Sequence, residues 1–148
     1  MMSNELSIVM VSFFSEKVIQ KALKHIPRKY KIFITDNAIT TNLKNILKKK
    51  FKNVEVLNPK SNLGNGAGIN FALKKTKSKY VLYLDVDTVL EKNTINELLI
   101  AAKKNKNWSI IAPNIKKYYY KKNDYIDNYQ GREISYMKFV EGCALFFK

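Results

Sequence analysis

The stretch Tyr80-Val81-Leu82-Tyr83-Leu84-Asp85-Val86-Asp87 joins a continuous apolar run to two carboxylates that are separated by one residue. Such a run predicts a strand, Tyr80 to Leu84, with both faces covered. In an extended chain Asp85 and Asp87 point to the same side, where their charges repel unless a cation or a hydroxyl group satisfies them. The triplet alone also fits a strand end followed by helix-capping aspartates. Directly after a buried strand, ligand binding is the better interpretation.

Strand-like and helix-like segments alternate on both sides of this stretch. Apolar runs predict strands at Leu6–Val11, Ile32–Ile34, Val54–Leu57 and Ser109–Ala112. Apolar residues at helical spacing predict helices over residues 18–26 and 40–50, near Ile69–Leu73, and after a capping box of Thr94 and Glu97. Alternation at this spacing indicates an α/β fold of three layers around a mostly parallel sheet.

The pattern changes after Pro113. Residues 116–127 are rich in tyrosine and lysine without clear periodicity, and strands are expected at Tyr136–Val140 and Ala144–Phe147. The tyrosine–lysine segment is interpreted first as an edge strand, although such a composition also suits nucleic acid or membrane headgroups. The sequence stops at Lys148 within an apolar run, so we expect one domain, 1–148, truncated at its carboxyl end.

Composition limits the class of protein. Hydrophobic residues make up 46% of the 148 residues, which suits a globular domain, and no apolar run reaches the roughly 18 residues of a membrane span. A single cysteine and an amino terminus unlike a secretion signal favour a reduced, cytoplasmic setting. The net charge of +15 favours anionic partners, although part of the lysine excess is attributable to composition bias.

Polar residues follow the predicted strands where each one ends. Ser12 ends the first, Asp36 and Asn37 the second, and Asp85 the fourth. Because ligands of open α/β sheets bind beyond the carboxyl ends of the strands, these side chains are candidates for one site. A carboxylate at Asp36 could accept a hydrogen bond from a base N–H, although an Asx-turn also fits the Asp-Asn pair.

The glycine-rich segment from Asn62 to Asn70 lies between a predicted strand and a predicted helix. Glycines such as Gly64, Gly66 and Gly68 let a backbone approach a ligand closely, and a following helix offers its first N–H groups to an anion. The segment matches neither the dinucleotide fingerprint nor a P-loop. A flexible turn with a helix cap is the alternative.

In this order and spacing, the motifs resemble the inverting family-two glycosyltransferases of GT-A fold, especially rhamnosyltransferase-like members. The resemblance covers nearly the whole chain. The matching pieces are 8–12, 34–37, 62–70, 80–88, which is the most specific, and Gly142-Cys143-Ala144. The residues after Asp36-Asn37, Ala38 and Ile39, depart from the small residue and serine usual in the family.

The resemblance implies a role for each matching residue. Ser12 and Phe13 would line the base pocket, with Asp36 and its neighbour Asn37 contacting the nucleotide. Residues Asn62, Gly64, Gly66 and Gly68 would shape the wall near ribose and diphosphate. Asp85 would face the ribose or sugar, and Asp87, with Asp85 beside it, would hold Mg²⁺ or Mn²⁺ as a Lewis acid for the leaving diphosphate.

The expected activity is sugar transfer from a UDP-, dTDP- or GDP-sugar to a glycan or lipid-linked acceptor, in polysaccharide biosynthesis at the inner face of the membrane. The catalytic base is expected beyond Lys148. A nucleotidyltransferase is one alternative, although Ser12-Phe13-Phe14-Ser15 stands where such enzymes carry a basic glycine-rich loop. A basic module that binds nucleic acid or anionic membrane is the other, and nucleic acid is the less favoured partner.

Overall fold

A computed structural model describes residues 5–114, Val140 and 142–148. Along the chain these residues form β1 (Leu6–Ser12), α1 (Val18–Lys24), β2 (Lys31–Asp36), α2 (Asn42–Lys50), β3 (Val54–Leu57), α3 (Gly64–Leu73), β4 (Tyr80–Leu84), α4 (Thr94–Lys104), β5 (Ile110–Ile111) and β6 (Ala144–Phe147). The tyrosine–lysine segment 116–127, expected as an edge strand, lies outside the described ranges. Residues 136–139 of the strand expected at Tyr136–Val140 also lie outside them, and Val140 is not in a strand.

The strands form one sheet in the order β3-β2-β1-β4-β6-β5. β1 pairs in parallel with β2 and with β4, and β2 pairs in parallel with β3. β6 runs antiparallel to both β4 and β5. The predicted mostly parallel sheet is therefore confirmed, but among the described residues β5 is a two-residue edge strand that pairs with β6 alone, in the antiparallel direction.

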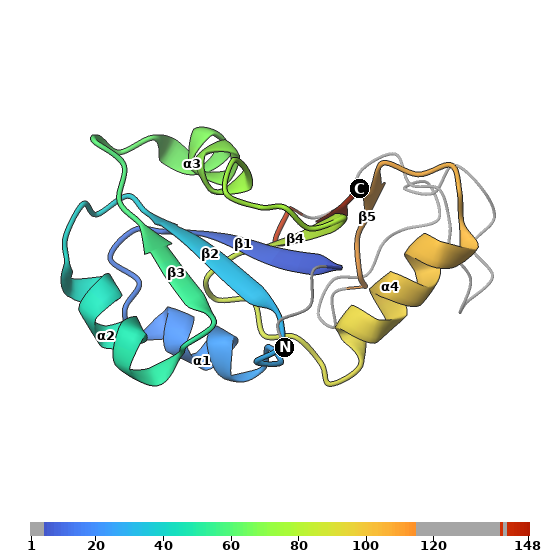
Figure 1. Ribbon diagram of the computed structural model, residues 1–148, viewed down its shortest axis with the longest axis horizontal. Helices are drawn as coiled ribbons and strands as arrows, with labels where there is room; N and C mark the ends of the chain where they lie inside the picture. The colour runs from blue at the N-terminus through green and yellow to red at the C-terminus, as the bar shows by residue number, and fades with distance from the viewer. Residues whose placement is uncertain (1–4, 115–139, 141) are drawn as a thin grey trace.

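Helices cover both faces of the sheet in three layers (Figure 1). The larger core cluster joins one face of the sheet to apolar residues of α1, α2 and α4, among them Leu23, Leu47 and Leu98. A smaller cluster of Val9, Phe33, Ala72, Val81 and Tyr83 joins the other face to α3. Alternate residues of β1 and β4 enter the two clusters, which explains the uninterrupted apolar runs in their sequences.

The order of the strands reverses at β1. The chain moves from β1 outward to β2 and β3, then returns through α3 to place β4 on the other side of β1 (Figure 1). In doubly wound sheets the crevice for a ligand lies at such a switch point, outside the carboxyl ends of the strands. The topology therefore locates the candidate site beyond Ser12 and Leu84, where β1 and β4 end.

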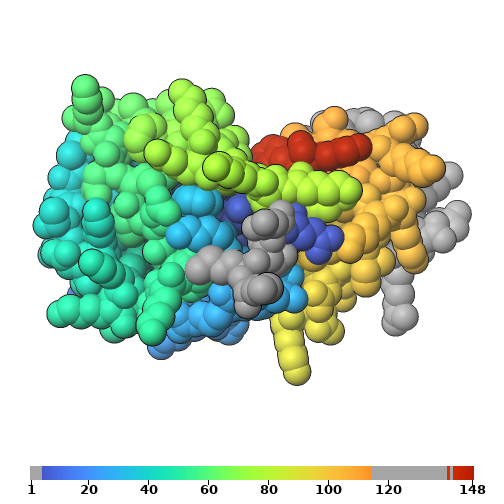
Figure 2. All heavy atoms as spheres, in the orientation of Figure 1, coloured from blue at the N-terminus to red at the C-terminus, as the bar shows by residue number. Residues whose placement is uncertain are grey.

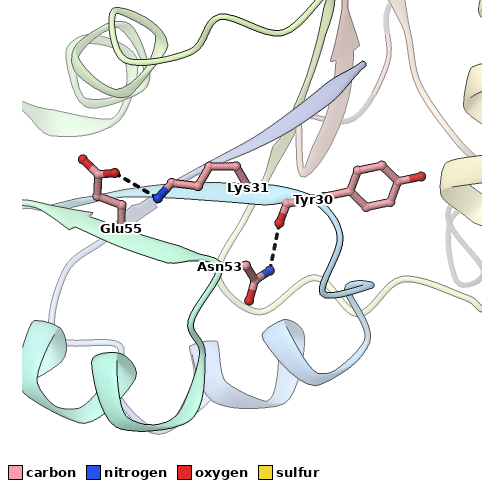
Figure 3. Close-up of polar contacts among 4 residues, drawn as sticks. All are labelled: Tyr30, Lys31, Asn53 and Glu55. Atoms are coloured by element: carbon pink, nitrogen blue, oxygen red, sulfur yellow. Dashed lines mark hydrogen bonds and ion pairs between the residues drawn. The ribbon is translucent and has the colours of Figure 1, made fainter. Parts of the chain in front are cut away.

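The opposite ends of β2 and β3 are fixed by polar contacts (Figure 3). The buried Asn53 Nδ2 donates to the Tyr30 carbonyl at 2.8 Å, and the Lys31 ammonium lies 3.1 Å from a carboxylate oxygen of Glu55. These contacts join the amino ends of the strands. They stabilise the register without occupying the edge where a ligand would bind.

Two predictions about helix starts are wrong. Asn93 precedes α4 and no side chain caps that helix, so Thr94 and Glu97 do not form a capping box. The helix expected near Ile69–Leu73 begins earlier, at Gly64, so most of the glycine-rich segment is helical. Glycine disfavours a helix by only about 1 kcal/mol per residue, which packing against the sheet can offset.

No helix in the described part of the chain combines the length and the apolar character needed to cross a membrane.

Candidate functional site

Ser12 and Asp36 end two neighbouring strands and lie side by side in the register of β1 and β2. Both are buried, each with 1% of its surface exposed. The Ser12 hydroxyl and the Asp36 Oδ2 atom have no hydrogen-bond partner within the protein. Because buried polar atoms are nearly always paired in folded proteins, two unpaired atoms on adjacent strands indicate a place where a ligand completes the structure.

Burial raises the pKa of the Asp36 carboxyl above its ordinary value of 3.8. The Ala38 N–H, 3.3 Å from Oδ1, opposes this effect, and the charge of Glu16 adds to it. This short-range bond is the Asx-turn contact that the Asp-Asn sequence allowed. It satisfies one carboxylate oxygen only, so the turn and a ligand-binding role are compatible at Asp36.

Asn37 holds the start of α3 against the end of β2. Its Nδ2 donates to the Gly64 carbonyl at 2.9 Å, and its Oδ1 accepts from the Leu63 N–H at 3.1 Å. The side chain is 4% exposed. Both ends of the amide are thus used to position the glycine-rich segment, and a direct contact from Asn37 to a nucleotide stays a prediction.

The three glycines predicted for the site have different surroundings. Gly64 has a φ of +70°, which favours glycine, and its N–H donates to the Asn62 Oδ1 at 2.8 Å. A Cβ at Gly66 would meet nothing within 4 Å, so its surface is open. A Cβ at Gly68 would lie 3.0 Å from a Val11 methyl group. Gly68 therefore lets α3 lie close to β1, and only Gly64 and Gly66 are free to face a ligand.

Tyr83 connects the acidic pair to α3, a role that the sequence analysis missed. Its hydroxyl hydrogen bonds to the Asp85 Oδ1 and lies 3.1 Å from the Asn65 Oδ1. A phenol carries one proton, so these acceptors compete for it, and the charged carboxylate is the stronger. Burial, followed by the contact with Asp85, raises the pKa of Tyr83 above its ordinary 10.0. The phenol therefore stays protonated and fixes one oxygen of Asp85.

The two carboxylates after β4 differ in exposure. Asp85 is half-buried, and its N–H donates to the Cys143 carbonyl at 2.9 Å. The Thr88 hydroxyl donates to the same carbonyl at 3.2 Å, so the turn is tied to the residue before β6. Asp87 is exposed.

The acidic pair is suited to a metal ion whose other ligands come from substrate and water. Among the described residues, no three His, Cys, Asp or Glu side chains are grouped as metal ligands. Mg²⁺ is ordinarily held by one or two carboxylates together with substrate phosphates and water. Asp85 and Asp87 fit that donor set, and they do not fit a site closed by protein atoms alone.

The amino end of α3 brings the two groups of polar residues together. Gly64 bonds to Asn37 beyond β2, and Asn65, one residue later, contacts Tyr83 on β4. Ser12, which ends the strand between these two, pairs with Asp36 in the register. The structure thus places Ser12, Asp36, Asn37, Gly64 and Asp85 along one edge of the sheet, as the sequence predicted.

Two loops at this edge expose apolar side chains. Phe13 and Phe14, directly after β1, are 56% and 64% exposed, and their rings meet edge to face at 4.6 Å. Phe14 has a φ of 49° and Ile39, after β2, a φ of 57°. Residues with side chains rarely adopt this conformation, and for a β-branched residue it is strained. Such strain is concentrated at functional sites.

Comparisons with known proteins agree with this geometry. The model of the family "Glycosyl transferase family 2" matches residues 7–146. None of the curated proteins matches the chain.

Three solved structures share the fold. The Staphylococcus aureus TarS 1-349 structure matches with a TM-score of 0.60 and 24% identity over 68% of this chain and 32% of that one. The structure of TarS 1-349 in complex with UDP matches with a TM-score of 0.64 and 19% identity, over 83% of this chain and 40% of that one. The mannosyltransferase PcManGT from Pyrobaculum calidifontis, in complex with GDP-Man and Mn²⁺, matches with a TM-score of 0.62 and 16% identity, over 72% of this chain and 34% of that one.

The chain therefore spans about a third of the length of the TarS 1-349 and PcManGT structures that it resembles. At these identities the structural likeness establishes the fold, which confirms the predicted GT-A-like class. The family match extends over nearly all of the sequence. This chain belongs to glycosyl transferase family 2.

Proposed function

We propose that this chain is the donor-binding part of a glycosyltransferase and binds a nucleoside-diphosphate sugar at the carboxyl edge of its sheet. The observation that carries the proposal is the Ser12–Asp36 pair, whose two buried oxygens have no partner in the protein. A base that donates an N–H and also accepts a hydrogen bond would satisfy both atoms. Phe13, exposed beside them, would cover one face of the ring.

The diphosphate would extend from the base toward the end of β4. The amino end of α3 spans this interval through its bonds to Asn37 and Tyr83. Backbone N–H groups and the dipole at the start of a helix favour an anion. The open Gly66 would let phosphate or ribose approach the backbone, beside Asn62 and Gly64.

Asp85 and Asp87 would complete the site at the sugar. Tyr83 fixes one oxygen of Asp85, and the remaining oxygen would bind a ribose or sugar hydroxyl or a cation. The exposed Asp87 would ligate Mg²⁺ or Mn²⁺, and its carboxylate stays hydrated until the ion binds. Bound there, the ion would supply charge neutralisation for the leaving diphosphate.

We propose sugar transfer with inversion to a glycan or lipid-linked acceptor, in the cytoplasm at the inner face of the membrane. An inverting displacement needs a base to deprotonate the acceptor hydroxyl. The chain spans about a third of the length of the TarS 1-349 and PcManGT structures, and we assign the base to none of its residues.

The solved relatives support a nucleotide donor without identifying it. One TarS structure contains UDP, and the PcManGT structure contains GDP-Man and Mn²⁺. The two carry different bases, so the base and sugar used by this chain, including the rhamnosyl type, require direct measurement.

Thermal unfolding tests the proposal. The melting temperature is measured with UDP, dTDP and GDP, each with and without Mn²⁺. A ligand that binds only the folded state stabilises it by mass action, by about 2.7 kcal/mol at a hundred times its dissociation constant. We expect one nucleotide to raise the melting temperature, and Mn²⁺ to increase that shift. No shift with any of the three in the presence of Mn²⁺ would overturn the proposal.

A further inference from the structure

Acidic residues are nearly absent from the segment that forms α1, β2 and α2. Residues 17–54 contain 11 lysines and arginines and one acidic residue, Asp36, which is buried. Ten of these cations are exposed, and the eleventh, Lys31, is paired with Glu55. The excess of positive charge in the whole chain is thus concentrated on a surface that the sheet does not cover.

The two helices form one continuous cationic face. Both pack into the same core cluster on one side of the sheet, through residues such as Ala22 and Leu43. Lys50 of α2 donates to the Gln20 Oε1 of α1 at 2.8 Å, so the helices also touch at their outer sides. Figure 2 shows α1 (blue) and α2 (teal) along the lower left of the molecule, with α3 (green) at the top. Glu91 borders this face at the far end of α1, beside His25 and Lys29.

An apolar tip adjoins this face at the amino ends of the two helices. It consists of Phe14, Val18 and Ile39, which are 64%, 47% and 46% exposed. Val18 is the first residue of α1, and Ile39 lies three residues before α2. The loops that carry them follow adjacent strands, and the Asn37 N–H donates to the Ser12 carbonyl at 2.8 Å. The two loops therefore lie side by side at the end of the sheet, and Ser15 and Glu16 separate Phe14 from Lys17, the first lysine of the face.

We propose that the α1–α2 face and its apolar tip dock this domain onto an anionic lipid bilayer. Lysines distributed over a face are attracted by the negative surface of anionic membranes, and exposed aromatic and aliphatic side chains insert at the level of the headgroups. Each half of the surface supplies one of the two contributions. A second copy of the chain would meet this face with like charge.

Nucleic acid suits the surface less well. Sequence-independent binding of strands uses lysines and arginines with aromatic rings, but aliphatic residues such as Val18 and Ile39 give no contact to phosphate. Arg28, the only arginine among the described residues, is engaged within the protein. It donates to the Lys50 carbonyl at 2.9 Å, and its guanidinium lies 4.6 Å from the Phe51 ring centre.

Docking in this orientation has a consequence that rests on the proposed function. The tip lies directly after β1 and β2, where the Ser12–Asp36 pair waits for a base. A donor site held at the membrane surface would meet acceptors that are anchored in the bilayer. The surface favours a lipid-linked acceptor over a free glycan.

Binding to vesicles tests the proposal without any donor or acceptor. Cosedimentation is measured with phosphatidylcholine vesicles, with and without phosphatidylglycerol, as a function of salt. We expect binding only to the anionic vesicles, and weaker binding as salt rises. Failure to bind them at low salt would overturn the proposal.

Two triple variants separate this face from net charge. Each removes three exposed lysines and lowers the formal charge from +15 to +12. The test variant carries Lys21→Gln, Lys24→Gln and Lys48→Gln. The control carries Lys74→Gln, Lys77→Gln and Lys79→Gln, between α3 and β4. We expect at least about a tenfold loss of affinity in the first and less than about twofold in the second. Equal losses would contradict the proposal.

Phe14→Asn tests the apolar tip. Asparagine tolerates the left-handed backbone that Phe14 adopts, so the fold should be retained. We expect vesicle affinity to fall several-fold, with the melting temperature unchanged. Unchanged vesicle binding would contradict a role for the tip, and tighter binding of wild type to oligonucleotides than to anionic vesicles would overturn the choice of a bilayer. None of these readouts depends on donor binding, so the proposed function can fail or hold independently.

Discussion

The two polar groups of the site differ in how the folded protein treats them. The Ser12–Asp36 pair is buried, packed between strands, and lacks partners for two of its oxygens. In the second pair, Asp85 is half-buried and Asp87 is exposed. Asp85 is held by the Tyr83 hydroxyl and the Cys143 carbonyl. The first pair thus has buried oxygens without hydrogen-bond partners, whereas the second pair is in contact with water.

The difference suggests how binding energy is distributed. Leaving a buried acceptor unpaired costs about 1–3 kcal/mol, which a ligand with matching donors recovers. The Ser12–Asp36 pair is thus preorganised for a neutral group such as a base. Two neighbouring carboxylates in contact with water have little free-energy cost without a ligand. They attract a cation together with its anionic ligand. The first pair should control which base binds, and the second should control dependence on metal.

The largest effect is expected at Asp87. Asp87→Asn removes a charged ligand of the metal and should weaken Mn²⁺-dependent nucleotide binding by about a hundredfold. Because Asp87 is exposed, the melting temperature of the free protein should stay within about 2 °C. Calorimetric titration with and without Mn²⁺ measures both affinities. Glu97→Gln, an exposed acid on α4, is the control and should change neither. Unfolding of Asp87→Asn would show that the residue is structural.

Asp36→Asn should separate binding from stability. Losing a charged acceptor should weaken nucleotide binding by about tenfold, with or without metal. Its pKa is raised in the folded state, so the penalty for burying the charge is present at neutral pH and vanishes as the pH falls through the raised value toward 3.8. The variant should therefore be more stable than wild type at pH 7, by about 1 kcal/mol.

Denaturant unfolding from pH 7 down to pH 3.5 checks this prediction. The stability advantage of Asp36→Asn should shrink as the pH falls. An advantage that grows toward acid, or a variant less stable at pH 7, would mean that the carboxylate is stabilised by the fold and is not awaiting a ligand.

Tyr83→Phe tests the link between the two groups. It removes the hydroxyl that contacts Asp85 and Asn65 and keeps the ring in the core, so stability should fall by about 1 kcal/mol. Release of Asp85 should weaken Mn²⁺-dependent binding by a few-fold and leave metal-free nucleoside binding unchanged. Titration with a nucleoside and with its diphosphate distinguishes these effects. An equal loss for both ligands would show that Tyr83 supports the whole edge and not the acidic pair.

The smallest effects should distinguish two glycines of α3. Gly66→Ala meets open space and should stabilise the helix by about 0.5–1 kcal/mol. Gly68→Ala places a methyl group 3.0 Å from Val11, so the gain from helix propensity should be cancelled or reversed. Melting temperatures of the two variants check this order. If Gly66 faces the diphosphate, Gly66→Ala alone should weaken nucleotide binding in a more stable protein.

Much of this architecture could be predicted from the sequence. Continuous apolar runs such as Tyr80–Leu84 identify buried strands, and the carboxyl ends of parallel strands meet at one edge. These two features predict Ser12, Asp36 and Asp85 at one edge, where the structure has them. The antiparallel strand β6 was also predicted as a strand, but its partner was not, because pairing between distant segments leaves little trace in local sequence.

The misses share a physical cause, which is dependence on tertiary contacts. Tyr83 looked like one more apolar residue of a strand, and only the position of Asp85 and Asn65 gives its hydroxyl a role. The predicted helix did not include Gly64 to Gly68 because glycine disfavours helices, yet the close approach of α3 to Val11 requires a glycine at position 68. The sequence also gives no sign that the Asn37 amide holds residues 63 and 64, because that role depends on where α3 begins.

The central claim is that one edge of the sheet contains a base site at Asp36 and a metal–diphosphate site at Asp87. Calorimetric competition with fragments of the nucleotide that gives the largest thermal shift tests it most directly. The nucleoside alone should bind without metal and lose affinity in Asp36→Asn, and pyrophosphate should bind only with Mn²⁺ and lose affinity in Asp87→Asn. Each fragment should compete with the intact nucleotide. Metal-independent binding of pyrophosphate, or a nucleoside indifferent to Asp36→Asn, would contradict the account.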